Sequence, residues 1–401
     1  MFYIKLGFRN ILKNFRRSFI TMISIIIGIV SCLLTRGFFI WNGNNLRESL
    51  VRSGIGHYQL YKKGYFRYGN EEPFSYLISN PYKILKDLKE MKEIELVTTR
   101  LQFNGILSSG KKSTIVSGEA GVPENEDKLN TFLALKEGKG LAKSKTIVVG
   151  EGVAKKLSIK IGDTLTLMCN AKGGGINALD FILIGILKTG YSEVDNIFAT
   201  ISLEDAGYLL NTGSSVQKII ILLRHTEDTT KVLTKIEEIC KKYNLEYKTW
   251  KELADFYESV KKIYDVLFVV IISIVLFIVT FTISNTVNMN IYDRIREIGT
   301  IRAIGTTRFQ IAGIFITESS LIGIIGSTLG LIVTYLFIFF VEIIEGLPVI
   351  VNNEIVKVFF KPDLPGIISC FILFTFVSIL ASLSSSYRAS KLSIVEALRW
   401  I

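Results

Sequence analysis

The spacing of four long apolar stretches constrains this chain most. They cover residues 18–41, 263–290, 310–341 and 364–387 of the 401-residue sequence. A hydrocarbon core about 30 Å thick needs about 20 helical residues to cross it, so each stretch predicts a transmembrane helix. Between the first two stretches lies a polar, mixed-charge segment at 42–262. The predicted fold is a membrane protein with four transmembrane α-helices in a 1+3 arrangement and a large α+β domain inserted between the first and second helices.

The charge balance points to a membrane surface rather than to nucleic acid. The chain carries 47 Lys and Arg against 36 Asp and Glu, a formal net charge of +11. The basic residues are scattered or flank the apolar stretches, and we find no nucleic-acid-binding motif. Each Lys or Arg near anionic head groups is stabilised by about 1 kcal/mol. We therefore expect the lipid bilayer as a partner, and no nucleic acid.

Basic residues also predict the orientation of the chain. They concentrate in the leader 1–17, in the loop 291–309 and in the tail 388–401, whereas the loop 342–363 carries two lysines and four acidic residues. Loops rich in Lys and Arg stay on the cytoplasmic side of a membrane. We therefore expect both termini in the cytoplasm and the domain 42–262 on the extracytoplasmic side.

Several residues inside the predicted spans are unusual for a lipid environment. Arg36 is expected to snorkel to the outer head groups, or else to make a polar contact with a neighbouring helix. Glu318 lies near the inner end of its span, where we expect an ion pair with nearby arginines or a role in positioning the loop 291–309. Gly323, Gly326 and Gly330 predict close helix packing, either within one subunit or between two.

The segment 42–262 mixes strand-like and helix-like patterns. Strands are predicted at His57–Tyr61, Thr146–Val149, Phe181–Leu187 and Ile219–Leu223, with helices at Pro81–Glu93, Lys231–Tyr243 and Lys251–Lys262, the last running into the second span. Cys169 and Cys240 could pair, but two cysteines form no disulfide framework. We expect an α+β domain on a helical stalk.

No pattern in this segment predicts catalysis. The sequence Gly105–Lys111 is one residue from a phosphate-binding loop, but the required Ser/Thr position holds Lys112 and Ser113 comes one place late. A hairpin turn is the better interpretation. His57 and His225 have no partners at metal-ligand spacing. The sequence therefore predicts a protein that is not an enzyme and that binds no metal or cofactor itself.

The loop 291–309 carries the most specific pattern. Ile291, Ile295, Ile298 and Ile301 recur with helical spacing, so they predict one apolar stripe. Charged residues and two glycines surround this stripe: Arg294, Arg296, Glu297, Arg302, Gly299 and Gly305. One interpretation is an amphipathic helix lying on the inner leaflet. The other is a short helix that docks into a soluble partner.

At this loop the chain resembles a known family, the permeases of MacB/FtsX/Lol-type ABC transporters. The resemblance covers nearly the whole chain, with Ile394 standing where the family usually has proline. It is closest to the stand-alone lipoprotein-releasing permeases. The matching segments are Arg296–Gly305, Arg9–Asn10, Asn14–Ser18, Gly150–Ala154 with Leu157, Ile161–Asp163 and Ile394–Arg399, with Trp41–Gly43, Gly56–Leu60 and Gly64–Phe66 for the lipoprotein-releasing type.

The resemblance implies a coupling helix in the loop 291–309. A dimer of separate ATPase subunits would bind ATP and Mg²⁺, and a second permease copy or a paralogue would complete the complex in the bacterial inner membrane. ATP-driven motion would reach the periplasmic domain, release lipoproteins and pass them to a periplasmic carrier. The residues that the resemblance assigns to coupling are Arg294, Arg296, Glu297, Ile298, Gly299, Ile301, Arg302, Ala303 and Gly305.

Two other functions within the family remain open. A MacB-like permease would export peptides or drugs, and an FtsX-like permease would activate a cell-wall hydrolase. For lipoprotein release, aromatic residues at the outer ends of the first two spans could form an entrance for acyl chains. An ordinary aromatic belt at the membrane interface is the alternative. These residues are Phe38, Phe39, Trp41, Tyr264 and Phe268.

Overall fold

A computed structural model describes residues 2–13, 15–69, 71–129, 134–142, 144–188, 192–351 and 354–390. The chain forms two compact units, which are described separately. The helical unit comprises Met1–Asn44 and Ser259–Ile401, and the globular unit comprises Asn45–Glu258. The globular unit lies within the predicted domain 42–262.

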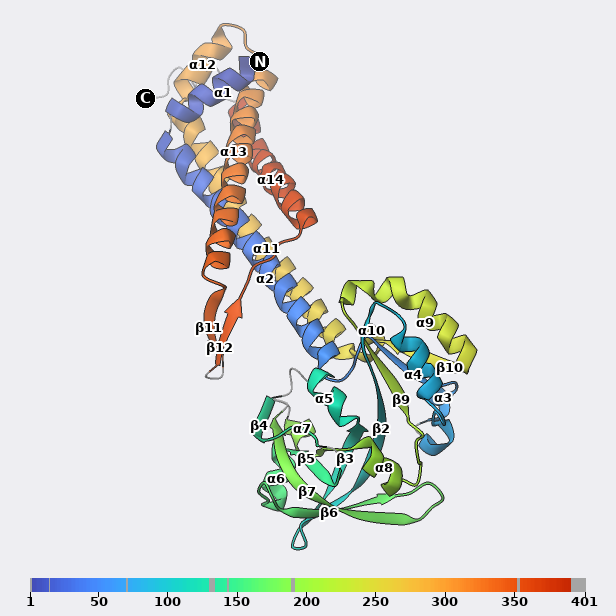
Figure 1. The fold of residues 1–401 in the computed structure, drawn as a ribbon. Coiled ribbons are helices and arrows are strands. Elements are labelled where there is room, and N and C mark those ends of the chain that lie inside the picture. Colours follow the sequence, from blue (N-terminus) through green and yellow to red (C-terminus); the bar gives the residue numbers. More distant parts are fainter. Residues whose placement is uncertain are drawn as a thin grey trace. The chain divides into compact units, whose positions relative to one another are not determined.

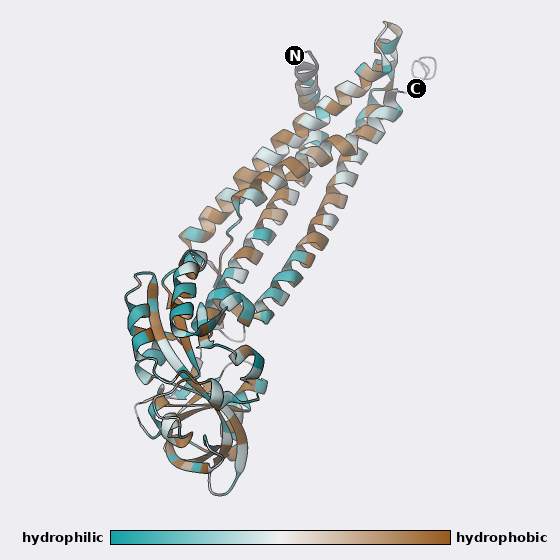
Figure 2. Cartoon of the chain, turned by 90° about the vertical axis from the view of Figure 1, so that its right-hand side faces the viewer, coloured by the Kyte–Doolittle hydropathy of each residue, from teal (hydrophilic) through white to brown (hydrophobic). Residues whose placement is uncertain are grey.

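Four helices of the described chain are long and apolar enough to cross a membrane. They are α2 (Phe15–Arg52), α11 (Asp255–Asp293), α13 (Arg308–Ile343) and α14 (Leu364–Ser390) (Figure 1). Each contains one of the predicted apolar stretches and continues past it. Figure 2 shows the hydrophobic residues in long runs along these helices. On α11, apolar side chains such as Phe277 and Phe281 are 72% and 67% exposed, as suits a surface in contact with lipid or a second subunit.

Shorter elements occur in the leader and in both loops, of which only the helix in the loop 291–309 was predicted. The leader contains α1 (Phe2–Lys13), which packs against α13. The loop 291–309 contains α12 (Ile295–Ala303). The loop 342–363 contains an antiparallel hairpin of β11 (Leu347–Val351) and β12 (Glu354–Val358). Both strands are rich in β-branched residues, which favour a β-strand.

Glycines on α13 allow close packing inside the helical unit. A Cβ atom added to Gly330 would lie 3.1 Å from Cβ of Ile29 on α2, and one added to Gly326 would lie 3.1 Å from Cγ2 of Ile25. Gly323 faces α14 instead, where its added Cβ would lie 2.8 Å from Cβ of Ser378. All three glycines therefore pack within one subunit, the first of the two predicted alternatives.

Of the two alternatives for Arg36, the structure shows the polar contact with a neighbouring helix. Its guanidinium forms a two-point ion pair with Asp363, with Nε–Oδ1 and Nη2–Oδ2 distances of 2.5 and 2.9 Å. The same group lies 5.7 Å from the ring centroid of Phe268. A carboxylate immediately before α14 satisfies the charge locally, so the side chain does not need to reach the head groups. Arg36 thus connects α2 to the start of α14.

The globular unit contains a mixed sheet of ten strands. Its longest strand is β2 (Ile94–Ser108), whose first half pairs with β9 and whose second half pairs with β3 and β6. The other strands are β1 (Tyr58–Lys62), β3 (Ser113–Gly121), β4 (Ala134–Gly138), β5 (Thr146–Gly150), β6 (Thr164–Asn170), β7 (Ile176–Lys188), β8 (Phe198–Ile201), β9 (Lys218–Leu223) and β10 (Leu245–Thr249).

The strands form two lobes that share β2. In the first lobe, β10, β1, β9 and β2 lie side by side, with α4 (Tyr82–Lys89) and α9 (Thr229–Tyr243) packed on one face. In the second lobe, β2, β3, β8, β5, β7 and β6 close into a ring. Figure 1 shows this ring below α4 and α9. Ring closure leaves few free strand edges around the second core.

Short helices complete the two lobes. The second lobe carries α6 (Glu151–Leu157), α7 (Ser192–Asp195) and α8 (Leu203–Leu209), and α5 (Pro123–Leu129) follows β3. The remaining helices are α3 (Tyr65–Tyr68), α10 (Trp250–Leu253) and the 3₁₀ turns Pro73–Tyr76 and Thr226–Asp228. Strand β9 is buried on both faces: Ile219 and Ile221 face α4 and α9, whereas Ile220 faces Trp250. This explains its continuous apolar sequence.

Most elements predicted in the globular unit are confirmed, with shifted ends. The segment Gly105–Lys111 is confirmed as part of a β-hairpin, because its turn joins β2 to β3. The predicted helix Lys251–Lys262 is wrong as a single element, since Ala254 separates α10 from α11. Cys169 and Cys240 do not pair: both are free thiols, buried in the cores of different lobes.

Candidate functional site

The helix predicted to contact a partner is α12, and its local sequence explains where it begins and ends. Arg294 precedes it with non-helical dihedral angles, so the chain turns sharply between α11 and α12. After α12, Gly305 has a φ of +108°, a conformation that side chains other than glycine rarely adopt. Thr307 then caps α13 through reciprocal hydrogen bonds with Gln310. The helix is therefore held between two fixed turns.

One face of α12 is buried and the other is exposed. Ile291, Ile295 and Ile298 are buried, as the predicted stripe requires. Ile301 departs from the stripe, because its side chain is 36% exposed. The exposure continues at Ile304, which is 82% exposed at the end of the helix. The stripe ends one turn early because α12 itself ends at Ala303.

The exposed residues near α12 form a mixed surface of apolar and basic side chains. Its apolar members are Tyr292, Ile301, Ile304 and Phe309, with exposures of 60%, 36%, 82% and 90%. We call these four residues and the exposed Arg296 the coupling surface. Large apolar groups next to a cation are typical of a protein-binding surface. Of the other predicted coupling residues, Gly299 is buried, Arg302 is half-buried, and Ala303 and Gly305 are exposed.

Ion pairs connect α12 and the end of α11 to the N-terminal segment. Lys13 Nζ lies 2.9 Å from Glu297 Oε1, and Arg294 Nε lies 2.9 Å from Glu297 Oε2. Arg17, on α2, pairs with Asp293. Hydrogen bonds from Lys13 and Arg294 hold the pKa of Glu297 below its usual range. The charged carboxylate of Glu297 therefore connects α12 to Lys13, which lies before the first span.

A buried polar cluster lies behind this surface, centred on Glu318 of α13. Glu318 is 3% exposed. Asn10 donates a hydrogen bond to its Oε2 and Asn290 donates one to its Oε1, both at 3.4 Å. Arg294 Nη1 lies 3.9 Å from Oε2. The predicted contact with an arginine of the inner loop is thus present.

A small cavity of about 10 Å³ adjoins Glu318, lined also by Thr21, Thr286, Asn290 and Ser319. A cavity of this size in polar surroundings has room for about one water molecule. Residues from α1, α11 and α13 therefore meet at one polar point inside the helical unit, together with Arg294 of the turn between α11 and α12.

Sequence reasoning missed several partners at this site. Lys13 was assigned only to a basic leader and Asn10 only to a family-like segment of that leader. Asn290 was assigned only to the end of a span, and Asp293 only to the loop that follows it. Their contacts join segments that are far apart in the sequence, so no local pattern reveals them. The family-like segments Asn14 and Ile394–Arg399 lie outside the described residues.

The aromatic residues predicted at the entrance lie together. The Phe39 and Tyr264 rings stack with centroids 4.8 Å apart, and Phe38 lies 6.1 Å from Trp41. Phe268 lies apart from these contacts, beneath the Arg36 guanidinium. The hairpin region adds Phe359 and Phe360, which contact Trp41 and Phe38 and were not predicted. The cluster is half-buried, which suits both an acyl-chain entrance and an aromatic belt.

Buried His57 has hydrogen bonds on both ring nitrogens. The Leu223 backbone N–H donates to Nδ1 at 3.0 Å, so Nε2 carries the proton and donates to Thr226 Oγ1 at 2.9 Å. Thr226 in turn donates to Glu48 at 2.7 Å. In this arrangement the imidazole cannot act as a base toward Thr226. Burial lowers the pKa of His57 to about 4, which keeps it neutral. Among the described residues, no group of three or more His, Cys, Asp or Glu side chains could hold a metal ion.

Comparison with protein families identifies two matching profiles. The MacB-like periplasmic core domain matches residues 18–239, and the C-terminal domain of FtsX-like permeases matches residues 269–394. The first match covers more than half of the chain. The second contains α12, Glu318 and the three helices that follow the globular unit. Together they account for both units.

Individual proteins that match the chain over most of its length are consistent with these two profiles. An uncharacterised ABC transporter permease of Methanocaldococcus jannaschii is 25% identical over 99% of this chain and 97% of its own length. The lipoprotein-releasing system transmembrane protein LolC of Neisseria meningitidis is 22% identical over 75% of this chain and 73% of its own. Among solved structures, the periplasmic region of MacB from Actinobacillus actinomycetemcomitans covers 52% of this chain and 95% of its own, with 15% identity and a TM-score of 0.37.

Proposed function

Because the chain belongs to the MacB/FtsX-type permeases of ABC transporters, we propose that it is the non-catalytic membrane subunit of a complex in which a separate ATPase drives motion of the globular unit. The ATPase docks on the coupling surface and supplies the ATP and Mg²⁺ sites. In this proposal both termini and α12 lie in the cytoplasm of a bacterium, and the globular unit lies outside the inner membrane. A second permease copy or a paralogue completes the dimer.

The observation that carries this proposal is the construction of α12. One side of this helix is fixed by buried isoleucines, and Glu297 forms ion pairs with Lys13 and Arg294. Its exposed side carries Ile301, with Tyr292, Ile304 and Phe309 exposed on the adjoining residues of α11, the following turn and α13. A partner that pushes on this face moves α12 together with α1 and the ends of α11 and α13. Helices satisfy their backbone hydrogen bonds internally, so they act as stiff elements in lipid. A lipid-bound amphipathic helix would not need ion pairs to Lys13 of α1 and to Arg294.

Lipoprotein release is the substrate class we propose first. The support is the similarity to LolC, which is named as part of a lipoprotein-releasing system. Each buried CH₂ of an acyl chain contributes about 0.8 kcal/mol to membrane anchoring, so a lipoprotein with several chains needs external work to leave the bilayer. A periplasmic carrier then receives it. The aromatic cluster around Phe39 and Tyr264 is the proposed point of entry for the acyl chains.

MacB-like export of peptides or drugs is a second candidate, favoured by the match of residues 18–239 to the MacB-like periplasmic core domain. The two functions differ in a reconstituted membrane. Lipoprotein release predicts that ATP moves a triacylated lipoprotein from proteoliposomes to a soluble carrier. If the complex hydrolyses ATP and the lipoprotein stays in the vesicles, export is the better assignment.

The coupling role is tested by reversing one charge. Glu297→Lys removes two ion pairs and places a cation beside Lys13 and Arg294, so α12 loses its anchor. We expect normal insertion but about a tenfold or greater loss of ATP-driven activity, equivalent to at least about 1.4 kcal/mol in coupling. Glu342→Lys is the matched control, because Glu342 is an exposed acid at the opposite end of α13. Equal activity of the two variants would show that α12 merely rests on lipid.

A further inference from the structure

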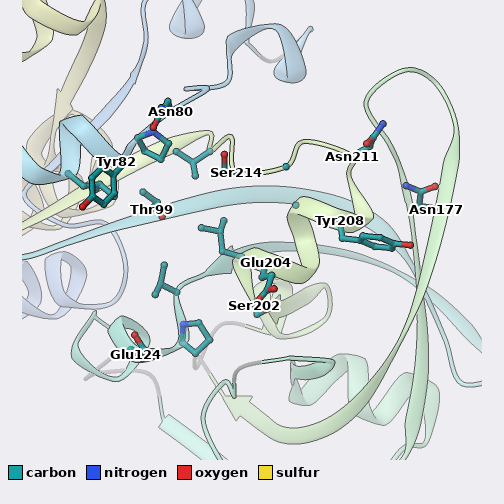
Figure 3. Close-up of a pocket in the computed structure, with 18 of the residues that line it drawn as sticks. Asn80, Tyr82, Thr99, Glu124, Asn177, Ser202, Glu204, Tyr208, Asn211 and Ser214 are labelled. Carbon is teal, nitrogen blue, oxygen red and sulfur yellow. The ribbon is translucent and has the colours of Figure 1, made fainter.

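The globular unit contains a cleft of about 1410 Å³ that includes none of the residues around α12. Residues from both lobes line it: the start of α4, the loop before α5, the hairpin between β6 and β7, and α8 with the residues that follow it. Figure 3 shows Tyr82 and Tyr208 on opposite sides of this cleft, with Glu204 and Ser202 between them. Its walls are thus built from segments far apart in the sequence.

The wall formed by α8 is held rigidly. Ser202 caps the helix, because its hydroxyl accepts the Asp205 backbone N–H at 3.1 Å and donates to Asp205 Oδ2 at 2.7 Å. Asp205 also accepts the Lys145 backbone N–H at 2.9 Å. Glu204 and Tyr208 are four residues apart on this helix, so they share one face. A fixed helix therefore presents a carboxylate and an aromatic ring to the same space.

The charged side chains among the described residues that line the cleft are all acidic. Glu124 and Glu204 are its ionisable carboxylates, and no Lys or Arg is among its described lining residues. This is notable in a chain with a net charge of +11. Tyr82 and Tyr208 are 74% and 73% exposed, and exposed aromatic rings attract cations as well as apolar groups. The cleft is thus complementary to a positively charged ligand.

The remaining lining residues fit a polypeptide. The amides of Asn80, Asn177 and Asn211 can both donate and accept hydrogen bonds, as a peptide backbone requires. Leu85 and Ile176 supply apolar surface between them. The volume also exceeds the roughly 300–1,000 Å³ of most small-molecule sites. We propose that this cleft binds an extended peptide segment in which basic side chains alternate with apolar ones.

The proposal is tested by equilibrium binding to the full-length chain. The protein is reconstituted in nanodiscs of zwitterionic lipid, and the probe is a fluorescein-labelled hexapeptide of alternating lysine and leucine, followed by fluorescence anisotropy against empty nanodiscs. We expect saturable binding that weakens as salt is added, because the carboxylates are exposed. The double variant E124Q/E204Q should bind at least about tenfold more weakly, and Tyr208→Ala about threefold more weakly.

Two controls make the outcome decisive. Glu238→Gln removes an exposed carboxylate on α9, outside the cleft, and should bind the probe like the native chain. A glutamate–leucine hexapeptide of the same length should not bind. Equal affinity of E124Q/E204Q and the native chain, or equal binding of both hexapeptides, would overturn the proposal. The assay contains no ATP and no ATPase, so its result is independent of the proposed coupling function.

Discussion

Both units of this chain bury charged groups, but they hold them differently. In the globular unit, Arg100 lies 2.8 Å from both Glu119 and Glu126, and Lys218 lies 2.5 Å from Glu119. In the helical unit, the contacts of Glu318 are 3.4, 3.4 and 3.9 Å long, and a small cavity adjoins it. Short contacts fix strands β2, β3 and β9 in register. Long contacts beside a cavity leave room for helices to shift.

This difference indicates two roles for buried charge. Burial raises the pKa of Glu119, but attraction to Lys218 and Arg100 outweighs this and lowers the pKa to about 2. That carboxylate is therefore charged at any physiological pH and acts as a permanent structural link. Glu318 instead lies where α1, α11 and α13 meet Arg294, the residue before α12. We interpret the cluster around Arg100 and Glu119 as part of a fixed scaffold. We interpret the cluster around Glu318 as a joint, meaning a contact at which helices can shift.

The largest expected effect is a loss of stability when Arg100, in the scaffold cluster of the globular unit, is replaced. Arg100→Met leaves Glu126 and half of Glu119 buried without their cation, so we expect the free energy of unfolding to fall by about 3–5 kcal/mol. The measurement is the thermal unfolding of the detergent-purified chain. Arg224→Met is the control, since Arg224 is exposed, and it should cost about 0.5 kcal/mol. Equal losses in both variants would remove the distinction between scaffold and surface charge.

The pH dependence of the free energy of unfolding tests another buried group of the globular unit, His57. His57 has an ordinary pKa of 6.5 that burial lowers to about 4. Between these values the unfolded chain binds a proton that the folded chain does not, so stability falls as the pH falls. The full difference is about 3 kcal/mol between pH 7 and pH 4. In His57→Gln this part of the pH dependence should disappear. An unchanged pH profile would show that His57 is not buried as a neutral side chain.

A substitution at Glu318 should lower the ATP-driven activity more than it lowers the free energy of unfolding. Glu318→Gln keeps the shape of the side chain but removes its attraction to Arg294, so we expect about a tenfold loss of ATP-driven activity with less than about 1 kcal/mol of destabilisation. Ser320→Ala is the control, because Ser320 contacts only the backbone of its own helix among the bonds described. If Glu318→Gln unfolds the chain and leaves the activity per folded molecule unchanged, Glu318 belongs to the scaffold.

The smallest effect concerns glycine packing on α13. Alanine at Gly330 would press a methyl group against Ile29 at 3.1 Å, whereas Gly313 has nothing within 4 Å of such a group. Since alanine favours a helix over glycine by about 1 kcal/mol, Gly313→Ala should stabilise slightly and Gly330→Ala should not. The comparison uses the thermal midpoints of both variants in detergent. Equal stabilisation would show that α2 and α13 are not in close contact.

The sequence predicted the architecture well for physical reasons. Long apolar runs have few alternative structures, so all four long helices were placed, and family profiles confirm the predicted resemblance. The ring of strands was missed, because it depends on pairings such as β2 with β6 that join residues about 60 positions apart. The partner of Arg36 was not identified, because Asp363 lies 327 residues away.

Only the part of the candidate site that lies on α12 was predicted from the sequence. The residues of α12 were identifiable because their helical spacing is local. Lys13, Asn10 and Asn290 were not, since nothing in a basic leader or at a span end indicates which distant carboxylate it will contact. The cleft lined by Tyr82 and Glu204 was also missed, because these two residues belong to different lobes and come to line one space only in the folded globular unit.

The most direct test of the central claim is photocrosslinking from the coupling surface. A photoreactive amino acid replaces Ile304, which is 82% exposed, and in a control variant it replaces Leu336, which is 62% exposed near the C-terminal end of α13. In native membranes we predict an adduct at position 304, identified by mass spectrometry as an ATP-hydrolysing subunit, and none at position 336. Labelling of lipid alone at both positions would contradict the account.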